Sequence, residues 1–239
     1  MNNPINLTDP DGRWPIWPIV NALASAVGNY LKGHNSGTQQ RYQTEPARGD
    51  TKAGLRDTKA GRISNTTGKP VGDWVVRADQ AHKNAPEPHF NVNPKATGLP
   101  DPHTKIPGGA KTLKALENTG KTIDAIGKVA KPVAIVTDVV RMGDAINQDG
   151  GTVGKNTVVT GASVAGGWAG ASVGATIGAE GGAAAGGAIG AFFGGVGAVP
   201  GAAVGGFIGG LGGGIAGAFG GSWLAEEGAK KAVETVEKK

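Results

Sequence analysis

The sequence predicts a mostly α fold, in which glycine-zipper helical hairpins follow a helical pair and a small irregular, partly disordered N-terminal region. Three observations support this class. Glycine recurs at every fourth position between residues 157 and 225, apolar residues follow helical spacing between residues 111 and 148, and few apolar residues precede residue 111. Segments that bury little apolar surface do not offset the entropy lost on ordering.

The glycine period defines the largest predicted element, residues 157–225. Because residues i and i+4 lie on one helix face, this period lets a second helix approach closely. Each interior glycine costs roughly 1 kcal/mol relative to alanine, so close helix contact has to offset a large penalty. Val199, Pro200 and Gly201 predict the turn between two such helices. The glycines of the period are Gly166, Gly170, Gly174, Gly178, Gly182, Gly186, Gly190 and Gly194, and then Gly201, Gly205, Gly209, Gly213, Gly217 and Gly221.

Residues 157–225 also have the composition of membrane-active helices. Glu180 is the one charged residue between Lys155 and Glu226, and the uncharged stretches reach the roughly 20 residues that span a bilayer. In lipid, small residues at spacing four allow helices to associate. We expect Glu180 to lie at a helix boundary or to face an aqueous lumen. The alternatives are a water-soluble packed bundle and a glycine- and alanine-rich linker.

The composition limits the other classes of function. The chain has 239 residues, no cysteine and a net charge of +5. Disulfides and thiolate metal sites are therefore excluded, and the mild basic charge suits an anionic partner, either lipid or nucleic acid. No signal peptide is predicted, because the first residues lack a basic region followed by an apolar one. We expect no cofactor.

Composition shifts divide the chain into segments. A short amphipathic helix is expected at 14–32. Residues 33–69 are expected to be a flexible linker, with His34 in solvent, and residues 70–107 a small His/Pro-rich module. The following segments are a helical pair at 111–148 broken at Pro132, the glycine helices at 157–225, and a charged tail at 226–239. The polar residues of the helical pair are expected on a solvated face; they are Asp124, Asp138, Arg141 and Asp144.

The module at 70–107 carries the candidate catalytic residues. They are Arg77, His82, His89 and His103, with Asp79, Asn91 and Asp101 nearby. Two histidines with an arginine suit acid–base cleavage of RNA, because the arginine stabilises phosphate charge. A His-Asp-His set also suits a metal ion, but the spacings match no standard site, so no metal is predicted. The third interpretation is a proline-locked loop whose polar side chains satisfy local backbone groups.

The N-terminal residues carry a motif formed by Pro4, Asp9, Pro10 and Gly12. The motif resembles the end of the core domain of Rhs (YD-repeat) proteins, over residues 3–13, with Arg13 where that family has leucine. The resemblance implies that this chain is a fragment preceded by a large core cage, which the core cuts after this motif. It also implies that the remaining residues are a variable C-terminal toxin. Residues 70–107 are similar to a module of other polymorphic-toxin tails.

Together, the resemblance and the glycine period predict an interbacterial Rhs-type toxin, an effector of type VI or related secretion. It would insert its glycine helices into the target membrane and dissipate ion gradients, without enzyme chemistry. The alternative is a nuclease-type toxin using Arg77, His82 and His89, whose glycine helices serve packing or translocation. A third class is a non-toxic structural or adaptor-binding tail.

The same resemblance implies the expected partners and location. The partners are the target-cell membrane, the upstream Rhs core cage, a cognate immunity protein and a secretion adaptor or chaperone. Further copies of the chain would join it in the membrane, and nucleic acid is a partner only under the nuclease alternative. The protein is expected to be secreted into the target cell and to associate with the membrane there.

Overall fold

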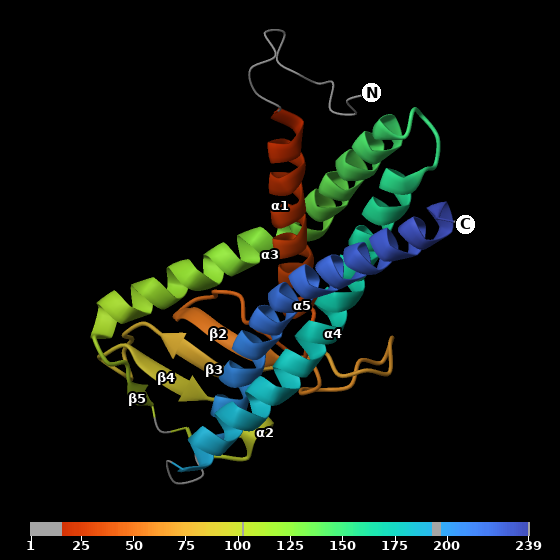
Figure 1. The fold of residues 1–239 in the computed structure, drawn as a ribbon. Helices are drawn as coiled ribbons and strands as arrows, with labels where there is room; N and C mark the ends of the chain where they lie inside the picture. The colour runs from red at the N-terminus through yellow and green to blue at the C-terminus, as the bar shows by residue number, and fades with distance from the viewer. Residues whose placement is uncertain (1–15, 102, 193–196, 239) are drawn as a thin grey trace. The chain divides into compact units, whose positions relative to one another are not determined.

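The computed structural model describes residues 16–101, 103–192 and 197–238, and it confirms the mostly α class (Figure 1). The helices are α1 (Ile16–Thr38), α2 (Pro94–Thr97), α3 (Gly109–Gln148), α4 (Lys155–Phe192) and α5 (Ala198–Glu237). The strands are β1 (Tyr42–Thr44), β2 (Thr51–Asp57), β3 (Asp73–Asp79), β4 (His89–Val92) and β5 (Thr104–Lys105). The motif residues Pro4, Asp9, Pro10 and Gly12, and also Gly194, lie outside the described residues.

The chain forms two compact units. Within the described residues, the first unit contains 16–36, 129–175 and 213–238, and the second contains 37–128 and 176–212. The helices α3, α4 and α5 each contribute residues to both units. The sheet lies entirely in the second unit.

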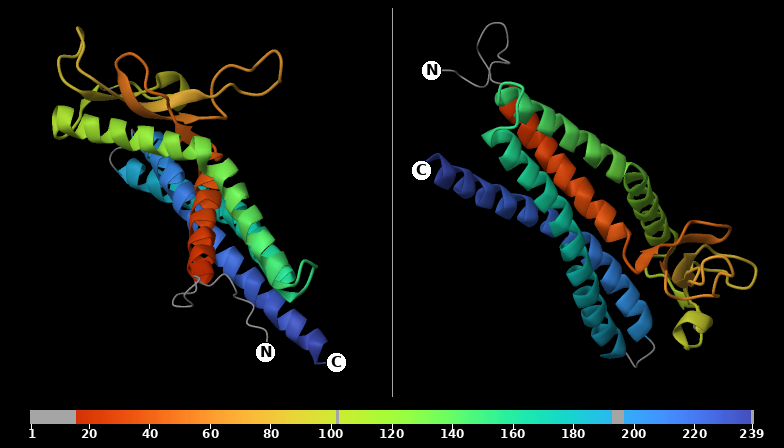
Figure 2. Two further views of the ribbon diagram at one scale, coloured as in Figure 1. Left: turned by 90° about the horizontal axis from the view of Figure 1, so that it is seen from above. Right: turned by 90° about the vertical axis from the view of Figure 1, so that its right-hand side faces the viewer.

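The glycines of α4 and α5 face one another in each unit. The two helices lie side by side (Figures 1 and 2). In the first unit, a Cβ added at Gly170 would overlap the carbonyl oxygen of Gly217. In the second unit, a Cβ added at Gly182 would overlap the carbonyl oxygen of Gly205. The other opposed pairs are Gly166 with Gly221, Gly174 with Gly213, Gly178 with Gly209, and Gly186 with Gly201. Backbone therefore meets backbone along the antiparallel pair.

Helix α1 uses the same kind of contact. In the first unit, a Cβ at Gly33 would overlap the backbone of Ile215. In the second unit, a Cβ at Gly37 would lie 2.7 Å from the Cα of Leu211. These glycines are spaced by four residues at the end of α1, which explains why the helix continues to Thr38 although its last turns are polar.

A five-stranded antiparallel sheet, in the order β1-β2-β3-β4-β5, forms the rest of the second unit. Its buried Tyr42 and Val75 form a core with Ala203 and Phe207 of α5. A second cluster joins Ala78 of β3 to Ile106 and Leu113, so that the start of α3 also packs on the sheet.

The prediction of a flexible linker at 33–69 is wrong, because this segment contains the end of α1 and two strands. The segment is ordered although it has few apolar residues. Backbone hydrogen bonds between β2 and β3 and the core contacts of Tyr42 and Leu55 stabilise it. An ion pair of 2.6 Å between Arg41 and Asp57 also joins the residue before β1 to the last residue of β2. The module at 70–107 is likewise not separate, because its strands belong to the same sheet.

The predicted helical pair at 111–148 is one continuous helix, α3, with Pro132 inside it. A proline removes one backbone hydrogen bond, which costs about 3 kcal/mol. The fully buried Ala130 and Ala134 flank the proline and stabilise the helix on both sides.

The turn predicted at residues 199–201 is also displaced. Helix α5 begins at Ala198, so Pro200 lies in its first turn, where the missing N–H leaves no helical hydrogen bond unmade. The residues predicted as a charged tail continue α5 to Glu237. Within the described residues, the glycine segment therefore consists of two long helices, and no turn interrupts either of them.

Two neighbouring glycines test the backbone contact. Gly221→Ala places a Cβ against the carbonyl oxygen of Gly166, and we expect it to lower the free energy of unfolding by about 2 kcal/mol. Gly220→Ala meets no atom within 4 Å, so it should raise that energy by up to about 1 kcal/mol. Urea unfolding of both variants measures the difference, and equal midpoints would contradict the contact.

Candidate functional site

The predicted polar residues of the second unit gather at one end of β3 and β4. Asp79 and His89 are directly opposite each other in the antiparallel pair, and so are Arg77 and Asn91. The Asn91 side-chain amide donates to Asp79 Oδ2 at 2.5 Å. A guanidinium nitrogen of Arg77 lies 3.7 Å from the same oxygen, and this guanidinium stacks 3.9 Å above the Trp74 ring.

Two further histidines flank the buried His89. The ring centroid of His82 lies 5.1 Å from that of His89, and the ring centroid of His103 lies 5.2 Å from it. His82 belongs to a turn closed by two backbone hydrogen bonds with Ala85. His103 follows Asp101 and has a left-handed backbone, with φ 47. The structure therefore brings together all four candidate residues predicted from the sequence.

Burial and hydrogen bonding distinguish the members of this cluster. His89 is 2% exposed and Asp79 is 5% exposed, whereas the His103 side chain is 56% exposed. His89 Nδ1 lies 2.9 Å from the carbonyl oxygen of Glu87. A ring nitrogen that faces a carbonyl oxygen carries a proton, so in the neutral ring Nε2 is the nitrogen that can accept. Neither His89 Nε2 nor Asp79 Oδ1 has a hydrogen-bond partner among the described residues.

The outer faces of the glycine helices form a second candidate site. In the second unit, the side chains of Ile177, Ile189 and Ile208 are about two-thirds exposed, and Trp223 and Leu224 of the first unit are equally exposed. The glycines occupy the helix contact, so the bulky residues between them point away from that contact, and these five side chains point into solvent. Of the described helices, α5 alone is long and apolar enough to cross a membrane by length and composition.

Glu180 lies inside α4, well before its last residue Phe192, and its side chain is exposed. The expectation that it marks a helix boundary is therefore wrong, because α4 continues through Gly181 and Gly182 to Phe192. The carboxylate leaves the helix on a face other than that of the paired glycines, and solvent surrounds it.

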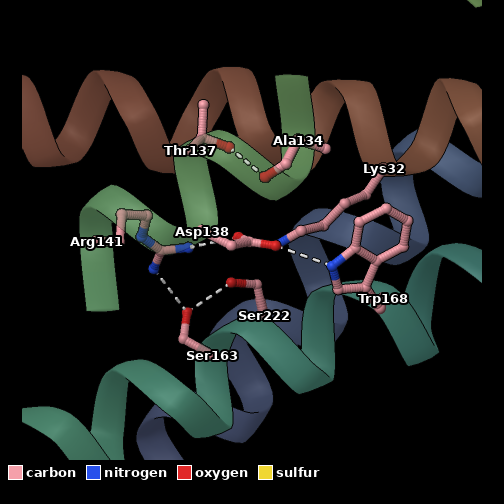
Figure 3. Close-up of polar contacts among 8 residues, drawn as sticks. All are labelled: Lys32, Ala134, Thr137, Asp138, Arg141, Ser163, Trp168 and Ser222. Carbon is pink, nitrogen blue, oxygen red and sulfur yellow. Dashed lines mark hydrogen bonds and ion pairs between the residues drawn. The ribbon is translucent and has the colours of Figure 1, made fainter. Parts of the chain in front are cut away.

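A buried polar network joins four helices in the first unit (Figure 3). Lys32 of α1 is fully buried and forms an ion pair of 2.6 Å with Asp138 of α3. The other oxygen of Asp138 accepts a hydrogen bond of 2.8 Å from the indole N–H of Trp168 in α4. Arg141 donates to Ser163 at 3.1 Å, and the Ser163 hydroxyl lies 2.7 Å from the Ser222 hydroxyl of α5.

This network corrects the expectation of a solvated face on α3. Asp138 and Arg141 are buried, while Asp124 and Asp144 are half-buried and accept hydrogen bonds from Thr44 and Gln148. Burial lowers the pKa of Lys32, although the hydrogen bond to Asp138 opposes this shift. Burial likewise lowers the pKa of Arg141. The spacing of polar residues on α3 is compatible with a solvated face and with a buried polar face. Only the positions of Lys32 and Trp168, which lie on other helices, show that the face is buried.

His34 was also expected in solvent, but it is 3% exposed within α1. Neither ring nitrogen has a hydrogen-bond partner among the described residues. Burial lowers the pKa of His34 from its ordinary value of 6.5, so the ring is neutral near pH 7. His34 lies directly after Gly33, at which α1 contacts the backbone of α5, and the polar residues around it in the sequence do not indicate this contact.

Comparisons with known proteins cover the part of the chain that holds the histidine cluster. Residues 29–126 match the family described as the C13G5.2-like N-terminal domain. Uncharacterized protein C13G5.2 of Caenorhabditis elegans is 30% identical over 165 residues, which are 60% of this chain and 47% of that protein. The chain thus spans about half the length of this relative. No solved structure matches the chain.

The buried ion pair predicts a large loss of stability when one partner is removed. Asp138→Ala leaves Lys32 buried without its counter-charge, and we expect the free energy of unfolding to fall by about 3–5 kcal/mol. Glu117→Ala removes a carboxylate that pairs with Lys114 and Lys121 on the exposed face of α3. This control should leave the same energy nearly unchanged, because pairs on an exposed face contribute little. Similar urea midpoints for the two variants would show that Asp138 is not desolvated.

The buried His34 predicts acid sensitivity. The unfolded chain binds a proton on this ring near pH 6.5, whereas the folded protein disfavours the charged form. Stability should therefore fall as the pH drops below 6.5, by up to about 1.4 kcal/mol per pH unit. The measurement is urea unfolding at pH 7.5 and pH 5, for wild type and His34→Gln. The variant should lose less stability on acidification, and an equal loss would contradict a neutral buried ring.

Proposed function

We propose that this protein is a membrane-inserting toxin whose α4–α5 pair enters the target bilayer and dissipates ion gradients. One observation carries the proposal. The glycines of α4 and α5 form the contact between the helices, while bulky apolar side chains such as Ile177, Ile208 and Trp223 are largely exposed. Exposed apolar surface of this kind is typical of a membrane or protein interaction site.

Lipid suits this arrangement better than water does. In a bilayer, helices associate through close packing of small residues, and large apolar side chains face the lipid tails. A backbone-to-backbone contact needs no apolar burial between the helices, so it persists when the surrounding solvent becomes hydrocarbon. The apolar length of α5 supports insertion.

The toxin class rests on the sequence motif at residues 3–13, which resembles the end of an Rhs core. Under this proposal an upstream cage shelters the apolar helices during secretion, and a cognate immunity protein protects the producing cell. A secretion adaptor or chaperone would assist delivery into the target cell, where copies of the chain assemble in the membrane.

The second candidate is a nuclease-type toxin, favoured by the convergence of Arg77, His82, His89 and His103. Arg77, His82 and His89 lie near the buried carboxylate of Asp79, and the His103 ring lies beside that of His89. This arrangement suits proton transfer and stabilisation of phosphate charge. In this case nucleic acid is the substrate, and the glycine helices serve packing or translocation.

Substitutions on the glycine face separate these mechanisms. In planar bilayers, the full chain should conduct, and Gly205→Ile with Gly209→Ile should abolish conductance while membrane binding persists. Isoleucine raises hydrophobicity but prevents the close approach that GxxxG contacts need. The matched control is Gly212→Ile with Gly220→Ile, where an added Cβ meets no atom within 4 Å; it should conduct. Glu180→Gln should lower cation preference without affecting insertion.

Two results would count against the membrane mechanism. Conductance that survives in the Gly205→Ile, Gly209→Ile variant would exclude the glycine contact as the conducting element. A folded His82→Ala, His89→Ala variant that keeps its conductance but is harmless to cells would favour the nuclease.

A further inference from the structure

We infer that Asp79, His82 and His89 form a binding site for a divalent transition metal such as Zn²⁺. One ligand atom from each residue can be chosen so that all three lie within 4.8 Å of one another. The inference is independent of the membrane mechanism, and it differs from the expectation, drawn from sequence spacing, that the chain holds no metal.

The sheet creates this site. Asp79 ends β3, His89 begins β4, and antiparallel pairing sets them opposite each other. His82 comes from the turn between these strands, whose hydrogen bonds with Ala85 bring its ring back beside His89. Spacing along the chain does not indicate such a site, because cross-strand pairing rather than a helical or knuckle repeat brings the ligands together.

His89 is already arranged as a metal ligand. Its Nδ1 faces the carbonyl oxygen of Glu87 at 2.9 Å, which leaves the lone pair of Nε2 directed away from that carbonyl. Metal-binding histidines commonly hold their other ring nitrogen in this way, because it fixes the tautomer and the ring orientation. His89 is 2% exposed, and Nε2 has no partner among the described residues. A buried acceptor without a partner destabilises the folded protein, and a bound cation removes that penalty.

Asp79 shows the same division between its two oxygens. Oδ2 accepts a hydrogen bond from Asn91 and faces Arg77. Oδ1 is buried and has no hydrogen-bond partner among the described residues. Asn91 and Arg77 thus orient the carboxylate, and the remaining oxygen is available to a cation. The guanidinium of Arg77 lies on the Oδ2 side of Asp79 and stacks on the Trp74 ring.

The ligand set favours Zn²⁺ or a similar ion. Two imidazoles and one carboxylate are typical of zinc sites that keep a fourth position for water, and carboxylate-rich sites suit Mg²⁺ or Ca²⁺ instead. Ligand atoms about 2.0–2.1 Å from the ion lie about 3.3 Å apart, so the set has to contract by at most about 1.5 Å. His82, which is in a turn and half-buried, can supply this movement by rotating its ring.

The test is titration of the metal-free full chain with Zn²⁺ in a calorimeter, with Co²⁺ absorption as a second readout. Wild type should bind one Zn²⁺ per chain and give the intense visible absorption of four-coordinate Co²⁺. Asp79→Asn and His82→Ala should each weaken binding at least tenfold and remove that absorption. Asp79→Asn keeps the size of the side chain, so it remains informative if His82→Ala does not fold by circular dichroism.

His103→Asn is the matched control. It removes a neighbouring histidine that is not assigned as a ligand, and asparagine tolerates the left-handed backbone at this position. Its affinity for Zn²⁺ should stay within about twofold of wild type. The inference is overturned if wild type binds no Zn²⁺ at millimolar concentration, or if Asp79→Asn and His82→Ala bind as tightly as wild type.

Discussion

The structure depends on the direct contact of helix backbones that glycine allows. Along α4 and α5, opposed glycines leave no room for a Cβ on either side. The contact gains dispersion energy from many atoms at short range, and it also offsets the low helix propensity of glycine. Helix α1 joins the same arrangement through Gly33 and Gly37, which meet the other glycine-rich side of α5.

This constraint also determines where the bulky residues lie. With the contact occupied by glycine, valine, isoleucine and the aromatic residues can only point toward other elements or toward solvent. In the second unit, Phe207 and Leu211 are covered by the sheet, whereas Ile208 and Ile189 are not covered. The sheet thus buries one side of α5, and the uncovered side is the apolar surface on which the membrane proposal rests.

Much of the fold could be predicted from the sequence, since it depends on local periodicity. The four-residue glycine period indicated the paired helices, and apolar spacing indicated α3. The sheet could not be predicted, because β1 and β2 contain few apolar residues and are held by backbone pairing with distant strands. For the same reason the polar residues around His89 could be named from the sequence, but their cross-strand arrangement could not. Asp138 and Lys32 were misjudged, because burial of a charge depends on a partner 106 residues away.

The hydroxyl pair of Ser163 and Ser222 distinguishes one alignment of α4 and α5 from others that the repeated glycines would also allow. A repeat of identical glycines is ambiguous, because sliding α4 along α5 by one helical turn would oppose glycine to glycine again. Such a slip would place Ser163 opposite Ala218 and leave two buried hydroxyls without the 2.7 Å contact that they now share. The Asp138 contact with Trp168 would be broken as well. The glycines therefore hold the two helices together, whereas the few buried polar groups select one register of the helices among several similar ones.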